Sequence, residues 1–299
     1  MTAEQFKSLL RMQNELNNET NGKWWFLGRA SNGKIINWDL CYCMERAELL
    51  DWFNWKHWTD AVGCKSEAEV KIELTDMAHF VLSKMLEAGY HNTIPVLLRN
   101  LPGYLDAKVT NDEELKPWLE KLNLGSEAWN MKLEEMITGL TALLNFQSVS
   151  DAQKDTILKN VKVSGREKPD QTDFVSVLMS GVIGDTYLAS SKADAQTEGF
   201  STYIIQEFYV FLALADLVYG FTCDDLFKYY IGKNALNKFR QNHGYKDGTY
   251  KKYWKIDENS TFDYEVEDNI VLTDHVIPKL DTTNLTIDTV YTELDKLYK

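Results

Sequence analysis

The feature that most constrains the fold is a helical periodicity of apolar residues that recurs along most of the chain. It is clearest between Glu67 and Ala88, where apolar side chains return every three or four residues and would form one packing stripe. No alternating strand pattern of comparable quality is present, so we predict an all-α fold. The predicted helices are Ala3–Asn18, Trp38–Trp58, Glu67–Ala88, Ser126–Leu144, Asp151–Val161, Thr172–Ala189, Thr202–Val218, Asp225–Asn242 and Ile287–Leu297.

Neither repeats nor low-complexity linkers interrupt the 299 residues. We therefore expect a single helical domain over residues 1–299, in which a core bundle carries additional peripheral helices. Asp224 and Gly244 are candidate start and stop signals of the eighth predicted helix. The segment from Tyr250 to Val271 is the best candidate for irregular structure, with room for a short hairpin.

Composition excludes several classes of function. The 45 acidic residues outnumber the 32 lysines and arginines, and the resulting net charge of −13 disfavours direct binding to nucleic acid or an anionic membrane. No apolar run approaches the length of a membrane span, and no secretory leader opens the sequence. The four cysteines lack the paired spacing of a zinc site and indicate reduced thiols. We therefore expect a cytoplasmic protein.

The second predicted helix carries two glutamates and two tryptophans on one face. An isolated E-x-x-E is explained about equally well by an ordinary solvated surface. Two indoles in register with the carboxylates argue against that explanation, because a solvated face seldom exposes such large rings. Helical spacing assigns Leu40, Cys43, Ala47 and Leu50 to the packing side and Glu45, Glu48, Trp52 and Trp55 to the opposite side.

A second carboxylate pair, Glu73 and Asp76, flanks the apolar stripe of the next helix. Packing of the two helices would bring four carboxylates together, and like charges repel unless cations neutralise them. Hard divalent ions such as Mg²⁺ prefer oxygen ligands. We therefore predict a Mg²⁺ centre with two or more ions, formed by Glu45, Glu48, Glu73 and Asp76.

A di-iron centre is the rival reading of the same helix. Asp76 and His79 form a D-x-x-H that is similar to the Glu-x-x-His of di-iron bundles. That architecture needs two such motifs, and the sequence offers one. His79 is also rotated about a quarter turn from the Glu73–Asp76 pair. A di-iron oxidase is therefore the weaker alternative.

A basic island offers a place for an anion. Seven lysines or arginines and one acid lie between Lys233 and Lys255. An exposed, charged helix end would also explain the cluster, but its interleaving with Asn, Gly and Tyr favours a clamp for phosphate and sugar. The predicted clamp residues are Lys233, Asn237, Arg240, Tyr245, Lys246, Tyr250 and Lys252.

Several blocks of the sequence resemble the dimeric, all-α dUTPases, which are relatives of the MazG-like NTP pyrophosphatases. The resemblance covers about residues 6–82 and 221–269, whereas the helical stretch of about 90–200 is treated as a family-variable insertion. Trp52 stands where the family usually has a small hydroxyl residue, and His57 where it usually has a third aromatic residue. The matching blocks are Met12–Asn17, Glu45–Leu49, Trp55–Trp58, Ile72–Phe80 and, most specifically, Lys233–Gln241 with Gly244–Tyr250, Lys252 and Trp254.

The resemblance implies Mg²⁺-dependent hydrolysis of dUTP and dUDP to dUMP, an activity that limits uracil incorporation into DNA. It also implies that the protein is a homodimer. Glu48 resembles the position that also orients and deprotonates the attacking water. Gln13 and Asn17, one helical turn apart, would face uracil, although a polar patch on an amphipathic helix also explains them. Trp55, Trp58 and Phe80 would wall the base or belong to the core, and His79 would lie on the base side.

Two alternatives keep the same helices. A related helical pyrophosphatase would act on dCTP or another nucleoside triphosphate with the same carboxylates. A non-catalytic regulator would bind nucleotide without hydrolysing it, although a complete set of four carboxylates argues against that function.

Overall fold

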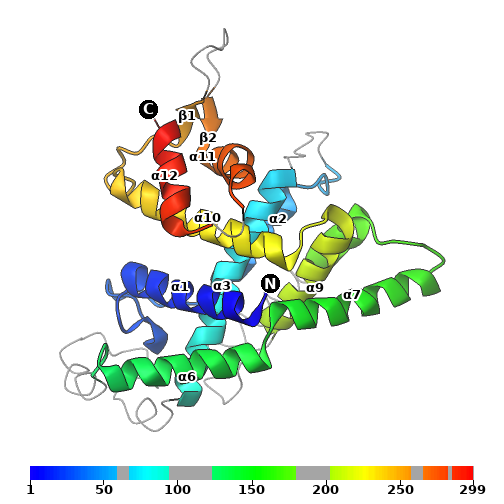
Figure 1. The fold of residues 1–299 in the computed structure, drawn as a ribbon. Helices are drawn as coiled ribbons and strands as arrows, with labels where there is room; N and C mark the ends of the chain where they lie inside the picture. The colour runs from blue at the N-terminus through cyan, green and yellow to red at the C-terminus, as the bar shows by residue number, and fades with distance from the viewer. Residues whose placement is uncertain (59–66, 94–122, 180–202, 257–264, 282–284, 299) are drawn as a thin grey trace.

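The structure, a computed structural model, describes residues 1–58, 67–93, 123–179, 203–256, 265–281 and 285–298 (Figure 1). Within these residues nearly all regular structure is helical, which confirms the predicted all-α class. The main helices are α1 (Ala3–Asn21), α2 (Trp38–Asp51), α3 (Glu67–Thr93), α6 (Glu127–Leu143), α7 (Phe146–Val163), α9 (Tyr203–Tyr219), α10 (Cys223–Asn242) and α12 (Ile287–Leu297), with short turns η1 (Trp25–Leu27), α11 (Asp268–Ile270), η2 (Val271–Val276) and η3 (Ile277–Lys279).

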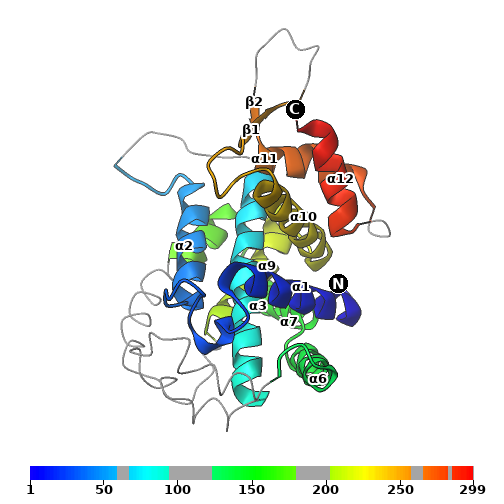
Figure 2. The ribbon, with the colours of Figure 1, turned by 90° about the vertical axis from the view of Figure 1, so that its left-hand side faces the viewer.

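Helix α3 runs through the middle of the molecule and organises the fold (Figure 2). Helices α1, α2, α6, α9 and α10 all pack against it. The predicted apolar stripe is confirmed, because Val70, Leu74, Met77, Val81 and Met85 are all buried. Several polar side chains of α3 are buried as well, since neighbouring helices cover more than one of its sides.

Helix α2 ends at Asp51, earlier than the predicted end at Trp58. The amides of Trp52 and Phe53 donate to carbonyl oxygens three residues back, over 3.2 and 3.1 Å, and these tight bonds close the last turn. Trp55 and Trp58 therefore lie in the following loop and not on a helical face with the glutamates.

The predicted packing face of α2 is wrong at two of its four residues, since Cys43 and Leu50 do pack on the core. Leu40 is 51% exposed and Ala47 is also exposed, although Leu50 is buried as expected. Trp52, which was assigned to the opposite face, is buried. The rotation of α2 about its axis is set by contacts distant in sequence, which helical spacing alone does not specify.

A buried ion pair fixes that rotation. Arg46 Nη1 lies 3.0 Å from Glu207 Oε2 of α9, and the Tyr42 hydroxyl donates to the same carboxylate over 2.9 Å. Arg46 also donates to the carbonyl oxygen of Leu178 over 2.6 Å. Because a buried guanidinium without partners is costly, these contacts hold Arg46 inward and set the direction of the neighbouring Glu45.

Helix α7 begins at Phe146, before the predicted start at Asp151. Asn145 caps it, because its side-chain oxygen accepts the Ser148 amide over 3.0 Å, and Phe146 is fully buried. Of the helix predicted over Thr172–Ala189, residues 171–179 are helical and the remainder lies outside the described residues.

Helix α10 starts two residues earlier than predicted, and Asp224 is not its cap. Thr222 accepts the Asp225 amide, and the Asp225 side chain accepts the Thr222 amide, which forms a capping box. The predicted stop near Gly244 is supported by its φ of +87°, a conformation that favours glycine.

The C-terminal segment covers the end of α10. The suggested hairpin is present as β1 (Tyr253–Lys255) paired antiparallel with β2 (Glu265–Glu267). Trp254 of β1 packs on Phe239 of α10 with ring centroids 5.5 Å apart. Helix α12 lies beside α10 (Figure 1) and matches its predicted bounds. This end of α10 carries the predicted anion-binding residues.

Among the described residues, no single helix combines the length and apolar content needed to cross a membrane. Helices α9 and α10 reach that combination only as a pair, and the pair is bent by 105°.

Candidate active site

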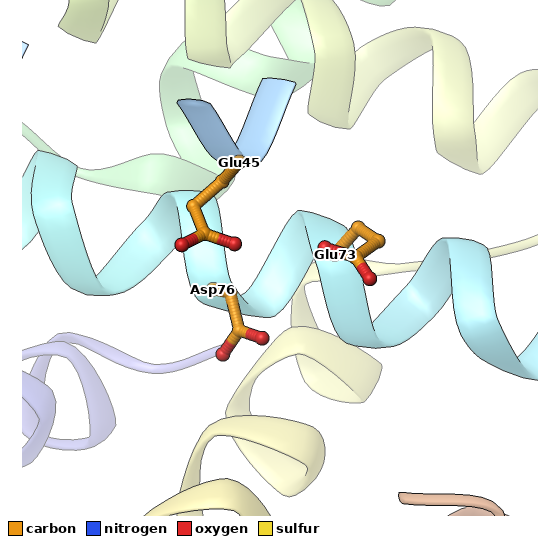
Figure 3. Close-up of side chains that lie close together, drawn as sticks. All are labelled: Glu45, Glu73 and Asp76. Atoms are coloured by element: carbon orange, nitrogen blue, oxygen red, sulfur yellow. The ribbon is translucent and has the colours of Figure 1, made fainter. Parts of the chain in front are cut away.

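Three carboxylates converge where α2 packs on α3 (Figure 3). One oxygen atom from each of Glu45, Glu73 and Asp76 lies within 4.8 Å of the other two. Glu45 comes from α2, whereas Glu73 and Asp76 lie three residues apart on α3 and therefore point to one side of it. The structure thus brings together three of the four predicted metal ligands.

The fourth predicted ligand, Glu48, is exposed on α2 and lies outside this group of three. Its negative charge nevertheless contributes to the raised pKa values of Glu45 and Glu73. Glu48 is therefore near the cluster and in contact with solvent, an arrangement suited to a residue that handles water. Its roles as ligand and base stay predictions.

The cluster is costly in its ionised form. Burial, followed by the charges of Asp76, Glu48 and Glu73, raises the pKa of Glu45 to about 8. Burial, followed by the charge of Asp76, raises the pKa of Glu73 to about 7. Both carboxylates hold protons more tightly than free glutamate because neither solvent nor neighbouring cations stabilise their charges enough.

Lys233 supplies a positive charge to the cluster from α10. Its Nζ lies 2.9 Å from Asp76 Oδ2 and 3.2 Å from Asn269 Oδ1, and its side chain is only 6% exposed. One lysine does not balance three carboxylates. The remaining negative charge, presented by oxygen atoms alone, fits a hard divalent cation such as Mg²⁺.

Trp52 contributes to the same site. Its side chain forms a hydrogen bond with Glu73 that acts to lower the pKa of that carboxyl, against the larger effect of burial. The indole is 7% exposed. One of the two positions at which the sequence departs from the pattern of the dUTPases that it resembles therefore touches the carboxylate cluster.

The metal-free protein is expected to lose stability as pH rises from 6.5 to 8, by roughly 1 kcal/mol after allowance for solvent screening. In this window the folded state binds more protons than the unfolded state, because the folded pKa of Glu45 is about 8 against a model value of 4.5. His79 has the opposite shift, from its usual pKa of 6.5 to about 4, so its unfolded form still releases protons just above pH 6.5 and offsets a smaller part of this loss. Urea unfolding in EDTA measures the change.

Glu45→Gln is the control for this dependence and is expected to reduce it, because the amide does not titrate and the raised pKa of Glu73 accounts for the part that remains. Added Mg²⁺ is expected to oppose the loss at pH 8. A free energy of unfolding that rises between pH 6.5 and 8 in EDTA would contradict the assigned shifts.

A buried polar network lies beside the carboxylates, between α1, α3 and α10. Gln13 Nε2 donates to Asn17 Oδ1 and to Ser83 Oγ, each over 2.9 Å. Gln13 Oε1 accepts the Tyr230 hydroxyl and lies 2.8 Å from His79 Nδ1. The polar atoms of Gln13 are thus bonded within the protein, and its contact with a base stays a prediction.

His79 presents an acceptor without a partner. Since Gln13 Oε1 is an acceptor, His79 Nδ1 carries the proton in this bond, which leaves Nε2 with a free lone pair. Burial lowers the pKa of His79 to about 4, so the ring is neutral. Nε2 is buried and has no hydrogen-bond partner among the described residues. A ligand with an N–H group would satisfy it.

The aromatic residues predicted to wall a base do not form one group. Trp55 and Trp58 pack edge to face with centroids 5.5 Å apart, and Trp58 is 63% exposed. Phe80 of α3 is half-buried and lies 6.2 Å from the ring of Trp38. Within the part of the chain that the structure describes, no ring contact joins Phe80 to Trp55 or Trp58.

The predicted phosphate clamp is partly assembled. Lys233, Asn237 and Arg240 lie on α10, and Asn237 is half-buried. Arg240 Nε and Nη2 each donate to the Asp268 carboxylate over 2.7 Å. The Tyr250 hydroxyl donates to Asp268 Oδ2 over 2.8 Å. Two predicted clamp residues therefore share one buried carboxylate.

The remaining clamp residues lie in the loop after α10. Tyr245 is 55% exposed, Lys246 is exposed, and Lys252 pairs with Glu267 over 2.8 Å. Gly244 lets this loop return on itself, because a Cβ there would lie 1.9 Å from Thr249 Oγ1. The loop therefore presents two side chains, Tyr245 and Lys246, to solvent near Arg240.

Asp268 and Asn269 were missed by reasoning from the sequence, as were Ser83 and Tyr230. Ser83 lies one helical turn after His79, a spacing that could have identified it. Asp268 and Asn269 follow β2 within the segment predicted to be irregular, and no periodicity marks them.

Comparison with known proteins adds a family to this geometry. A protein-family model described as dUTPase matches residues 5–245. The matched span includes α2, α3 and α10, and so contains the carboxylate cluster and Lys233. No curated protein matches the chain.

Proposed function

The chain belongs to the all-α dUTPase family, and from this premise we propose that it hydrolyses dUTP and dUDP to dUMP with Mg²⁺ as cofactor. The family match itself supports a dUTPase-like nucleotide pyrophosphatase. The observation that carries the proposal is the convergence of Glu45, Glu73 and Asp76 next to the buried Lys233. The activity would limit uracil incorporation into DNA.

When bound, Mg²⁺ would supply positive charge that offsets the negative charge of the phosphate chain in the transition state. Glu45, Glu73 and Asp76 would hold it, and Glu48 would complete the set from the solvent side. Glu48 would orient the attacking water and accept its proton as the water oxygen bonds to phosphorus. Pyrophosphate leaves from dUTP, and phosphate leaves from dUDP.

The cations of α10 would bind the phosphate chain. Lys233 and Arg240 lie on this helix, and Lys233 already touches Asp76 at the cluster. A phosphate oxygen arriving there would offer Lys233 a second anionic partner, and the guanidinium of Arg240 would add planar donors. Lys246 and Lys252 would meet the outer phosphates from the loop.

The acceptor on His79 supports uracil as the base. Uracil carries a ring N–H at N3, whereas cytosine has an unprotonated nitrogen there. The buried Nε2 of His79 has no donor among the described residues and would accept that N–H. In cytosine the lone pair of N3 would face the lone pair of His79 Nε2, and Nε2 would stay without a donor.

A panel of nucleotides tests the substrate. We expect kcat/KM for dUTP to exceed that for dCTP by at least about a hundredfold, because a site built around a hydrogen bond rejects analogues that lack the donor. Release of nucleoside monophosphate from dUTP, dUDP, dCTP and dTTP measures it. Cleavage of dCTP at least as efficient as that of dUTP would make the chain a pyrophosphatase for another nucleotide.

A homodimer is also part of the proposal. The side of α2 that faces away from the core exposes apolar residues, with Leu40 51% and Met44 54% exposed, and Ile35 just before the helix is 67% exposed. Such a patch favours a protein contact. Sedimentation velocity tests it, and a strictly monomeric chain at micromolar concentration would refute it.

A further inference from the structure

Asp268 holds one edge of the Arg240 guanidinium. Arg240 Nε and Nη2 donate to its two oxygens over 2.7 Å each, and Nη2 also donates to Asn269 Oδ1 over 3.2 Å. A guanidinium has five N–H donors, and these bonds use those on Nε and Nη2. The donors of Nη1 have no partner among the described residues, so the ion pair leaves one edge of Arg240 available.

The same carboxylate also fixes the loop after α10. The Tyr250 hydroxyl donates to Asp268 Oδ2 over 2.8 Å, and the Asp268 amide donates to the carbonyl oxygen of Lys252 over 2.9 Å. Burial, reinforced by Asp268, raises the pKa of Tyr250, which therefore stays a neutral donor. Asp268 is fully buried and so joins α10 to this loop from within the protein.

Arg240 is held close to the carboxylate cluster. Asn269 Oδ1 accepts from both Lys233 and Arg240, over 3.2 Å in each case. Lys233 in turn contacts Asp76. A short chain of contacts thus leads from the predicted metal ligands to the guanidinium, although Asp268 and Asn269 lie beyond the residues matched by the family model.

We propose that Asp268 is a positioning residue for the phosphate chain of the substrate. By holding the Nε–Nη2 edge of Arg240 and the hydroxyl of Tyr250, it directs the Nη1 edge of Arg240 toward the bound anion. This inference rests on the proposed function, because it takes Arg240 as a phosphate contact. Asp268 itself does not touch the substrate and acts through Arg240.

Binding of a non-hydrolysable dUTP analogue (the α,β-imido triphosphate) and of deoxyuridine, measured calorimetrically with Mg²⁺ on the full chain, tests the proposal. Asp268→Asn is expected to weaken binding of the analogue by at least about tenfold, because a charge-assisted bond pair is lost. Deoxyuridine, which lacks phosphates, is expected to bind unchanged. In turnover, KM for dUTP is expected to rise more than kcat falls.

The matched control is Asp173→Asn. Asp173 accepts two bonds from Arg166, over 2.7 and 2.8 Å, in the same two-pronged geometry but in the segment after α7. This variant is expected to bind both ligands as the wild type does. Equal weakening by Asp268→Asn and Asp173→Asn would overturn the proposal.

A double variant separates positioning from general damage. If Asp268 acts through Arg240, Arg240→Gln and the double variant with Asp268→Asn bind the analogue equally. If the double variant instead loses affinity for the analogue by the product of the two single-variant factors, the proposal is overturned. Asp268→Glu keeps the charge and serves if the asparagine variant does not fold. Its longer side chain displaces the guanidinium of Arg240. We therefore expect weaker binding of the analogue and unchanged binding of deoxyuridine. Unchanged binding of the analogue would overturn the proposal.

The same measurements distinguish this inference from the proposed function. Absence of dUTP hydrolysis by the wild type would refute the proposed function, whereas the binding comparisons would still decide the role of Asp268. Hydrolysis by the wild type together with unchanged binding of the analogue by Asp268→Asn would refute the positioning role alone.

Discussion

Replacing Glu73 with glutamine is expected to lower kcat/KM for dUTP by at least about a thousandfold. Glu73 is half-buried and lies with Glu45 and Asp76 in a group whose oxygens come within 4.8 Å of one another. The amide of glutamine has nearly the same shape as the carboxylate but supplies no negative charge. The variant is therefore expected to lose activity because it binds Mg²⁺ more weakly. Steady-state kinetics over a range of Mg²⁺ concentrations, with calorimetry of Mg²⁺ binding, measures both effects.

Glu67→Gln is the matched control for this prediction. Glu67 lies on the same helix, is exposed, and pairs with Lys71 over 3.1 Å. It is expected to keep wild-type activity because exposed pairs contribute little. Retention of activity within about tenfold by Glu73→Gln would show that the three carboxylates do not hold the catalytic metal.

Replacing Glu48 with glutamine is expected to lower kcat by about a hundredfold to ten-thousandfold, the range for loss of a general base. Glu48 is exposed and lies outside the group of three carboxylates, yet its charge reaches Glu45 and Glu73. Most of the Mg²⁺ affinity is expected to remain, because three ligands are unchanged. Single-turnover kinetics at saturating Mg²⁺ isolates the chemical step.

The contrast between the two variants is the informative result. Glu73→Gln is expected to lose metal and activity together, and Glu48→Gln to lose activity while it still binds metal. Loss of Mg²⁺ binding by Glu48→Gln as complete as that of Glu73→Gln would make Glu48 a ligand and leave the base unassigned.

Local features of the fold were predictable because they repeat along the sequence. The stripe of α3 and the i,i+3 spacing of Glu73 and Asp76 follow from helical geometry alone. Hydrophobic periodicity also placed α12 correctly. The pairing of α2 with α3 required only that consecutive helices pack, and it brought Glu45 to the other two carboxylates.

Contacts between distant residues were not predictable in the same way. Arg46 and Glu207 are 161 positions apart, and their ion pair sets the rotation of α2 that helical spacing assigned only in part. Tyr230 and Gln13 are 217 positions apart. Such pairs depend on which surfaces meet after the chain folds, and no local pattern in either segment records the partner.

The predicted anion site illustrates both the predictable and the unpredictable features. Lys233, Asn237 and Arg240 were predicted from their spacing on one helix, and the structure places them there. Asp268, which binds Arg240, follows a short strand and carries no periodic signal. Predictions from spacing therefore identified the cations but not the buried carboxylate that orients one of them.

Release of pyrophosphate from dUTP by the purified chain, with Mg²⁺ and again with EDTA, tests the central claim most directly. The carboxylate cluster and its family predict stoichiometric dUMP and pyrophosphate in Mg²⁺ and no detectable product in EDTA. Binding of dUTP without Mg²⁺-dependent release of pyrophosphate would contradict the claim and leave a protein that binds nucleotide without hydrolysing it.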